Sequence, residues 1–244
     1  SRGDGVKTFV LAYRLIPEKE CRNLRYQSAV FRSSSFNADF SYGIWQDMLT
    51  VYYQCSKADG DFQLVSRRAD LLVRMFLSGY AFCALRSIGY VLTNWFEYDG
   101  KLANRIVVGK IEESHPDPNH ADNGPLKQSE AILPLVSEHA SLRRALDDFH
   151  SCVREVSPDL YVFAYRSIED VRSHFETSTV KDARRVAWER MNECLGYKKE
   201  DYDELVTLSE RYRHSNALEE PMDPSVAQRQ IGFVRGVIIK FIQY

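Results

Sequence analysis

The spacing of apolar residues changes character near the middle of this 244-residue chain. In the first half, short stretches rich in β-branched and aromatic residues are typical of strands, and they occupy residues 8–15, 47–55, 90–98 and 105–111. Apolar residues at helical spacing predict a helix over 65–87, and Asp99-Gly100 predicts a hairpin between the last two strands. We therefore expect the first half to be α+β, with a small antiparallel sheet and a helix packed on it.

The second half follows the helical period throughout. Its apolar stripes predict helices over 133–153 with a break near Ser141, from 159 onward, over 180–195, over 199–212 and from 224 onward. Gly196 is typical of a helix end, and Asp223-Pro224-Ser225 is typical of a helix start. We expect a bundle of about five helices joined by short connections.

A stretch dense in helix- and strand-breaking residues separates the two halves. Residues 114–128 read SHPDPNHADNGPLKQ and contain three of the eight prolines. Such a composition predicts a linker or loop. We accordingly expect an α+β domain over 1–113, a linker over 114–128 and a helical bundle over 129–244.

Charge is nearly balanced in both halves. Residues 1–128 hold 16 Lys and Arg against 14 Asp and Glu, and residues 129–244 hold 16 against 20. Neither half has the basic excess of a general nucleic-acid or membrane-surface binder. We therefore expect no DNA and no membrane partner, and any RNA must be recognised by a local pocket.

The five cysteines suggest the cellular compartment. They are no closer than 28 residues apart, so the chain has no CxxC pair for zinc or redox chemistry. We expect reduced, mostly buried thiols and a cytoplasmic protein. The polar residues 1–5 predict no signal peptide, and Arg74 and Arg86 interrupt the most apolar stretch before it could span a bilayer.

Motifs for familiar cofactors are absent from the sequence. It contains no HExxH, GxSxG, Walker or GxGxxG pattern, so we predict no cofactor. A cluster of possible metal ligands lies in the expected linker and consists of His115, Asp117, His120 and Asp122. A metal-dependent hydrolase built on it is an alternative, although we expect no metal because nothing rigid fixes the ligands.

Two arginine–histidine groupings are candidates for chemistry. Arg144 precedes His150 by six residues, and the segment Ser209–Asn216 (SERYRHSN) brings together Arg211, Arg213 and His214. A histidine can transfer protons near neutral pH, and guanidinium groups can bind and stabilise a phosphate, so together they can cleave RNA without a metal. The alternative is structural, because cationic residues at a helix C-terminus interact favourably with its dipole.

The second half also resembles a known family. FAYRSIEDV (Phe163–Val171), the tryptophan-containing VAWERMNECLG (Val186–Gly196) and SERYRHSN before an amphipathic last helix are similar to the HEPN superfamily, in particular its prokaryotic MauJ-like and abortive-infection members. The resemblance covers 142–244. It implies a small, often dimeric helical domain of toxin–antitoxin, antiphage or RNA-processing systems. In that group an aromatic-Arg-x-x-Glu helix faces an Arg-His segment.

The resemblance implies roles for particular residues. His214, Arg213 and Arg211 would be catalytic, and Arg166, Glu169 and Tyr165 would bind substrate. The sequence departs from the Arg-x4–6-His motif of active members, because Ser209, Leu208 and Thr207 stand where the arginine is required. Arg144 and His150 have that spacing but lie on a different predicted helix.

Two functions follow as expectations. The first is a HEPN-like effector of a prokaryotic defence or toxin–antitoxin system, a metal-independent ribonuclease activated by dimerisation or by a protein partner. The second is a non-catalytic HEPN-like binding and assembly subunit. Simpler interpretations accompany them. Arg166 and Glu169 would form a solvated i,i+3 pair or, if their helix is packed on both sides, be buried with His214 or Arg213 as partners. Trp45, Trp95 and Trp188 would anchor the core.

Overall fold

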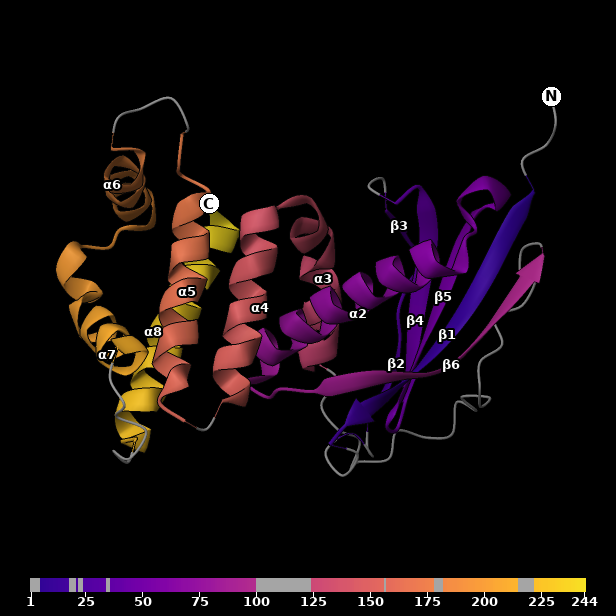
Figure 1. The fold of residues 1–244 in the computed structure, drawn as a ribbon, viewed down its shortest axis with the longest axis horizontal. Helices are drawn as coiled ribbons and strands as arrows, with labels where there is room; N and C mark the ends of the chain where they lie inside the picture. Colours follow the sequence, from indigo (N-terminus) through magenta and orange to yellow (C-terminus); the bar gives the residue numbers. More distant parts are fainter. Residues whose placement is uncertain are drawn as a thin grey trace. The chain divides into compact units, whose positions relative to one another are not determined.

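A computed structural model describes residues 5–17, 21, 24–33, 36–99, 124–155, 157–177, 182–214 and 222–244. The chain forms two compact units, each built from two separate segments. The sheet unit comprises Ser1–Leu77 and Ile88–Ala131, and the helical unit comprises Ser78–Ser87 and Ile132–Tyr244. The α+β fold class is confirmed (Figure 1).

The sheet unit contains six antiparallel strands within the described residues, in the order β2-β4-β5-β1-β6, with β3 paired to β4. Their bounds are β1 Val6–Ile16, β2 Arg25–Gln27, β3 Phe31–Ser33, β4 Ala38–Trp45, β5 Met48–Ser56 and β6 Gly89–Asp99. Three of the four predicted strands correspond to β1, β5 and β6, and the fourth, 105–111, lies outside the described residues. Strands β2, β3 and β4 are not predicted from the sequence pattern.

Helix α2 (Phe62–Ala84) follows a 3-10 turn, η1 (Lys57–Asp59), and its first part packs on the sheet. Alternate side chains of β1, from Phe9 to Leu15, are almost fully buried, as a half-covered strand requires. The ring of Phe76 on α2 lies 4.3 Å from that of Tyr42 on β4, centroid to centroid. The predicted helix on a small sheet is thereby confirmed.

Helix α3 (Gly124–Glu138) begins inside the expected linker. Its first part is tied to the sheet unit: Ser129 Oγ donates a 2.6 Å hydrogen bond to the carbonyl of Phe76, and the backbone N–H of Ala29 donates to Glu130 Oε1 at 2.9 Å. The last five residues of the expected linker are therefore helical, while 114–123 lie outside the described residues. Long-range hydrogen bonds of this kind leave no local trace in the sequence.

The helical unit contains α4 (Ala140–Arg154), α5 (Asp159–Ser173), α6 (Ala183–Leu195), η2 (Lys199–Asp201), α7 (Asp203–His214) and α8 (Pro224–Gln243), with the ends of α2 and α3. Helices α4, α5 and α8 lie side by side, and α7 packs on α5 (Figure 1). The core between them is made of fully buried aliphatic and aromatic side chains, including Leu142, Phe149, Ile168, Val234 and Val237. The predicted helices are confirmed, with the break near Ser141 at His139.

The tryptophans correct one expectation. Trp45 and Trp95 are 39% and 40% exposed, and Trp188 is half-buried, so none belongs to the fully buried core. Trp95 instead stacks on Phe62, and the guanidinium of Arg25 lies over the ring of Trp45. All five cysteines are free, and three of them, Cys21, Cys55 and Cys152, are buried. The described helices include none with the length and apolar character that crossing a membrane requires.

The start of α8 allows a first test of the fold. The Asp223 carboxylate accepts a 2.8 Å hydrogen bond from the backbone N–H of Ser225 and so caps the helix. We expect Asp223→Ala to lower the free energy of unfolding, because one N–H of the first turn loses its acceptor. Urea denaturation followed by circular dichroism measures this loss. Gln228→Ala, at an exposed position of α8, is the control, and an equal loss in both variants would contradict the capping role.

Candidate functional site

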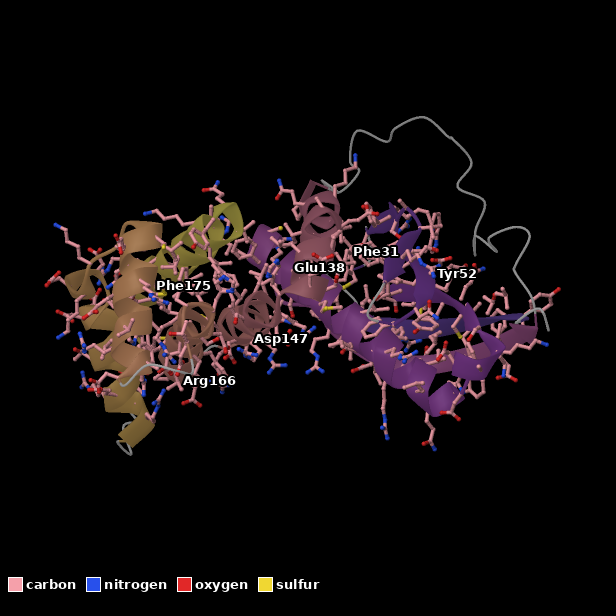
Figure 2. The ribbon with its side chains drawn as sticks, turned by 90° about the horizontal axis from the view of Figure 1, so that it is seen from above. Phe31, Tyr52, Glu138, Asp147, Arg166 and Phe175 are labelled. Carbon is pink, nitrogen blue, oxygen red and sulfur yellow. The ribbon has the colours of Figure 1, made fainter. Side chains whose placement is uncertain are left out.

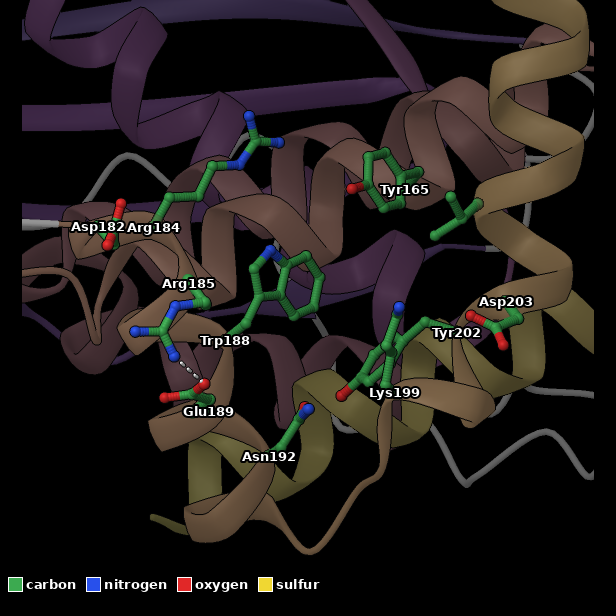
Figure 3. Close-up of a pocket in the computed structure, with 11 residues that line it drawn as sticks. Tyr165, Asp182, Arg184, Arg185, Trp188, Glu189, Asn192, Lys199, Tyr202 and Asp203 are labelled. Atoms are coloured by element: carbon green, nitrogen blue, oxygen red, sulfur yellow. Dashed lines mark hydrogen bonds and ion pairs between the residues drawn. The ribbon is translucent and has the colours of Figure 1, made fainter.

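A cavity of about 730 Å³ lies within the helical unit, among α5, α6, η2 and α7 (Figure 3). Its lining consists of Tyr165 from α5, then Asp182, Arg184, Arg185, Trp188, Glu189 and Asn192, and finally Lys199, Tyr202, Asp203 and Val206. The volume falls in the range of small-molecule and cofactor sites in proteins.

Three aromatic rings form the apolar part of the lining. The rings of Tyr165 and Trp188 are nearly parallel, with 18° between their planes and 6.5 Å between their centroids. Figure 3 shows these two rings beside each other, and Tyr202 meets Trp188 edge-on with centroids 5.3 Å apart. Neighbouring ring faces of this kind can stack with a planar group.

Cationic side chains surround the rings. Arg184 is paired with Glu169, and Arg185 Nη1 lies 2.5 Å from Glu189 Oε1 (Figure 3). Lys199 forms no ion pair with any residue that the structure describes. Exposed ion pairs are worth about 0–1 kcal/mol, so an anionic ligand can replace either carboxylate at small cost.

The three predicted substrate-binding residues of α5 separate in the structure. Tyr165 lines the cavity, and Glu169, one turn later, holds the cavity residue Arg184. Arg166, labelled in Figure 2, is instead paired with α4, where its Nη2 lies 3.1 Å from Asp148 Oδ1. The expected solvated pair between Arg166 and Glu169 is wrong, because each side chain has a partner on another helix.

The three predicted catalytic residues lie in the last turn of α7, which continues to His214, two residues beyond the predicted helix end at 212. Burial raises the pKa of the Tyr165 hydroxyl, and the charge of Arg213 opposes this weakly, less than that of Arg184 does, so Arg213 is near Tyr165. Arg211 and Arg213 leave a regular helix about 200° apart, so they do not converge on one phosphate. The side chain of His214 lies outside the described part of the chain.

The spaced pair Arg144 and His150 also fails to converge. Arg144 Nε donates to Asp170 Oδ1 on α5 at 2.8 Å, whereas His150 contacts Ser87 and Ser78. The expected metal cluster at His115, Asp117, His120 and Asp122 lies outside the described residues. Within the described ranges, no group of three or more His, Cys, Asp or Glu side chains could hold a metal ion.

A second polar feature lies between α4 and α5. Asp148 is almost fully buried, and burial raises its pKa to about 6, against the opposing effect of Arg166. Asp170 and Asp147 raise the pKa further through their charges. This carboxyl therefore changes protonation between mildly acidic and neutral pH.

Most of the residues that line the cavity are not predicted from the sequence. Arg184, Arg185 and Lys199 were not singled out, and Trp188 was assigned to the core. The only local signal is Arg-Arg-x-x-Trp at the start of α6, which places two cations one turn from an aromatic ring. In the sequence alone this pattern looks the same as an ordinary solvated helix face, because the residues of α5 and α7 that complete the cavity are distant in the sequence.

Comparison with known protein families gives a match over the helical half of the chain. Residues 129–244 match the model of a family described as "Domain of unknown function (DUF8168) C-terminal domain". No curated protein and no solved structure matches the chain. The match contains the whole cavity and carries no description of function.

Proposed function

We propose that the helical unit binds an unpaired nucleotide of RNA in the cavity among α5, α6 and α7. The observation that carries the proposal is the aromatic lining of Tyr165, Trp188 and Tyr202, bordered by Arg184, Arg185 and Lys199. Base–aromatic stacking is the usual way in which proteins bind single-stranded nucleic acids, and guanidinium and ammonium groups bind the phosphates.

The charge of the lining favours a short ligand. Its three cations are matched by Asp182, Glu189 and Asp203, so the cavity is not the basic groove that tracks a long backbone. Recognition would depend on one or two stacked bases and their phosphates. This agrees with the acidic balance of residues 129–244.

Of the two functions expected from the HEPN resemblance, the geometry favours a binding and assembly subunit. Arg211 and Arg213 diverge, and the Arg-x4–6-His spacing is missing. The protein would act in the cytoplasm as a homodimer or with a protein partner, and light scattering of the purified chain tests the dimer.

A ribonuclease of a defence or toxin–antitoxin system is the second candidate. The closeness of Arg213 to Tyr165 favours it, since the end of α7 then meets the cavity. Incubation of the full chain with total RNA in EDTA tests it, with and without a co-expressed partner. Fragments that disappear in His214→Ala and Arg213→Ala would support cleavage, and intact RNA in both settings would leave binding as the function.

Binding is tested by the fluorescence anisotropy of a labelled, unstructured RNA octamer. We expect Trp188→Ala to weaken binding about 5- to 150-fold, because the loss of one stacked base costs about 1–3 kcal/mol. Trp95→Ala is the control, since this tryptophan belongs to the sheet unit and does not line the cavity. Duplex RNA should bind weakly. Equal affinity of wild type and Trp188→Ala would refute the proposal.

A further inference from the structure

A second cluster of reactive groups lies in the helical unit, and it shares no residue with the cavity. It consists of Ser78 and Ser87 from the α2 end and of Asp147 and His150 from α4. Ser87 is half-buried and follows the end of α2, where Leu85 takes a left-handed backbone conformation with φ of +53°. That conformation turns the chain out of the helix and places the next residues beside α4.

The four side chains form a chain of contacts. Ser87 Oγ lies 2.6 Å from His150 Nε2, and the other ring nitrogen, Nδ1, lies 3.5 Å from Ser78 Oγ. Ser78 Oγ in turn donates a 2.7 Å hydrogen bond to Asp147 Oδ1. The order is serine, histidine, serine and aspartate.

These contacts specify the tautomer of His150. The single hydroxyl proton of Ser78 is committed to Asp147, so toward His150 the oxygen of Ser78 can only accept. The proton of a neutral imidazole is then favoured on Nδ1. Nε2 carries the free electron pair and accepts the hydroxyl proton of Ser87. A serine that donates to a histidine, itself oriented by a third group, is the arrangement of an activated nucleophile.

Burial and a neighbouring arginine keep the ring of His150 neutral. Burial, and then Arg154 on α4, lower the pKa of His150 to about 4, so the ring is neutral at physiological pH. Asp147 accepts the hydroxyl proton of Ser78, so Ser78 Oγ lies between this carboxylate and the ring of His150. Arg235 of α8 is occupied by the carbonyls of Phe82 and Cys83, at 3.1 and 3.3 Å.

We propose that Ser87 is a nucleophile that attacks carboxylic esters, with His150 as its general base and Ser78 as a positioning residue. Ser87 Oγ bonds to the carbonyl carbon while its proton passes to His150 Nε2. The ester C–O bond breaks, and the leaving alcohol takes that proton. Water then attacks the acyl-Ser87 ester, gives a proton to Nε2, and releases the acid while Ser87 recovers its proton.

The test uses a biotinylated fluorophosphonate and the 244-residue chain. In this reaction Ser87 Oγ bonds to phosphorus and fluoride leaves. We expect one modified peptide, mapped by mass spectrometry to Ser87. Ser87→Ala should remove the modification, while Ser137→Ala, at a serine that donates to the Pro134 carbonyl, should keep it. Absence of the adduct on wild-type Ser87 would overturn the proposal.

His150 and Ser78 have separate signatures. His150→Gln should slow labelling about 100-fold or more, as loss of a general base does. The wild-type rate should stay level from pH 8 to about 5 and fall near pH 4, in line with the lowered pKa of His150. Ser78→Ala should alter this pH profile, which a merely structural role would leave unchanged. Wild-type labelling rates in His150→Gln would exclude His150 as the base.

Discussion

Replacing Phe149 by alanine is expected to lower the free energy of unfolding of the helical unit by about 3–5 kcal/mol. Phe149 is fully buried on α4, and its ring meets that of Phe82 edge-on, with 5.6 Å between the centroids. The truncation leaves a cavity between α4 and the last turns of α2. Urea denaturation followed by circular dichroism measures the loss.

Phe76→Ala is the matched variant in the other unit. Phe76 is equally buried, on the part of α2 that belongs to the sheet unit, and packs against Tyr26 and Tyr42. Hydrogen exchange resolved by peptide should place the loss of protection in α4 and α5 for Phe149→Ala, and in the strands for Phe76→Ala. Identical protection patterns in the two variants would contradict the division of the chain into these units.

Asp148→Asn is expected to remove a pH dependence worth about 2–3 kcal/mol between pH 4 and pH 6. The pKa of Asp148 is raised to about 6 in the folded protein, above its value in the unfolded chain. The folded state therefore binds more protons across this window, so its contribution to stability is present below pH 4 and is lost as the pH rises through 6. Asparagine does not titrate, so the variant should be the more stable protein at pH 7.

Urea midpoints of wild type and Asp148→Asn at several pH values test this sign. Arg166→Gln is the second variant, because the guanidinium of Arg166 lowers the pKa of Asp148. Its removal should move the pH window upward. A stability difference between wild type and Asp148→Asn that is independent of pH would contradict the raised pKa.

The fold could be predicted where the pattern is local. Strands β1, β5 and β6 have β-branched and aromatic side chains. The side chain of Asp223 marks the start of α8, and the left-handed backbone of Gly196 marks the end of α6. Strands β2 and β3 have three residues each, too few for a periodic pattern. The start of α3 depends on Ser129 and Glu130, whose partners are remote in the sequence.

The candidate site was predictable only in part, for a similar reason. The aromatic-Arg-x-x-Glu pattern located Tyr165 and Glu169, which reach the cavity region because they lie one turn apart on the same helix face. Arg166 lies between them, and only its partner Asp148 on α4 determines its direction. Ser87 and His150 are 63 residues apart, so their contact exists only in the folded chain.

The helical unit is assembled from two separated segments, and this affects how its gene can be cut and recombined. The family match starts at residue 129, inside α3, and omits Ser78–Ser87. A fragment made from the matched residues alone would lose the aromatic partner of Phe149 and the carbonyls that Arg235 binds. The sequence boundary of the family is thus not a folding boundary, and an exchange of domains at residue 129 would succeed only where the new neighbour supplies an equivalent helix end.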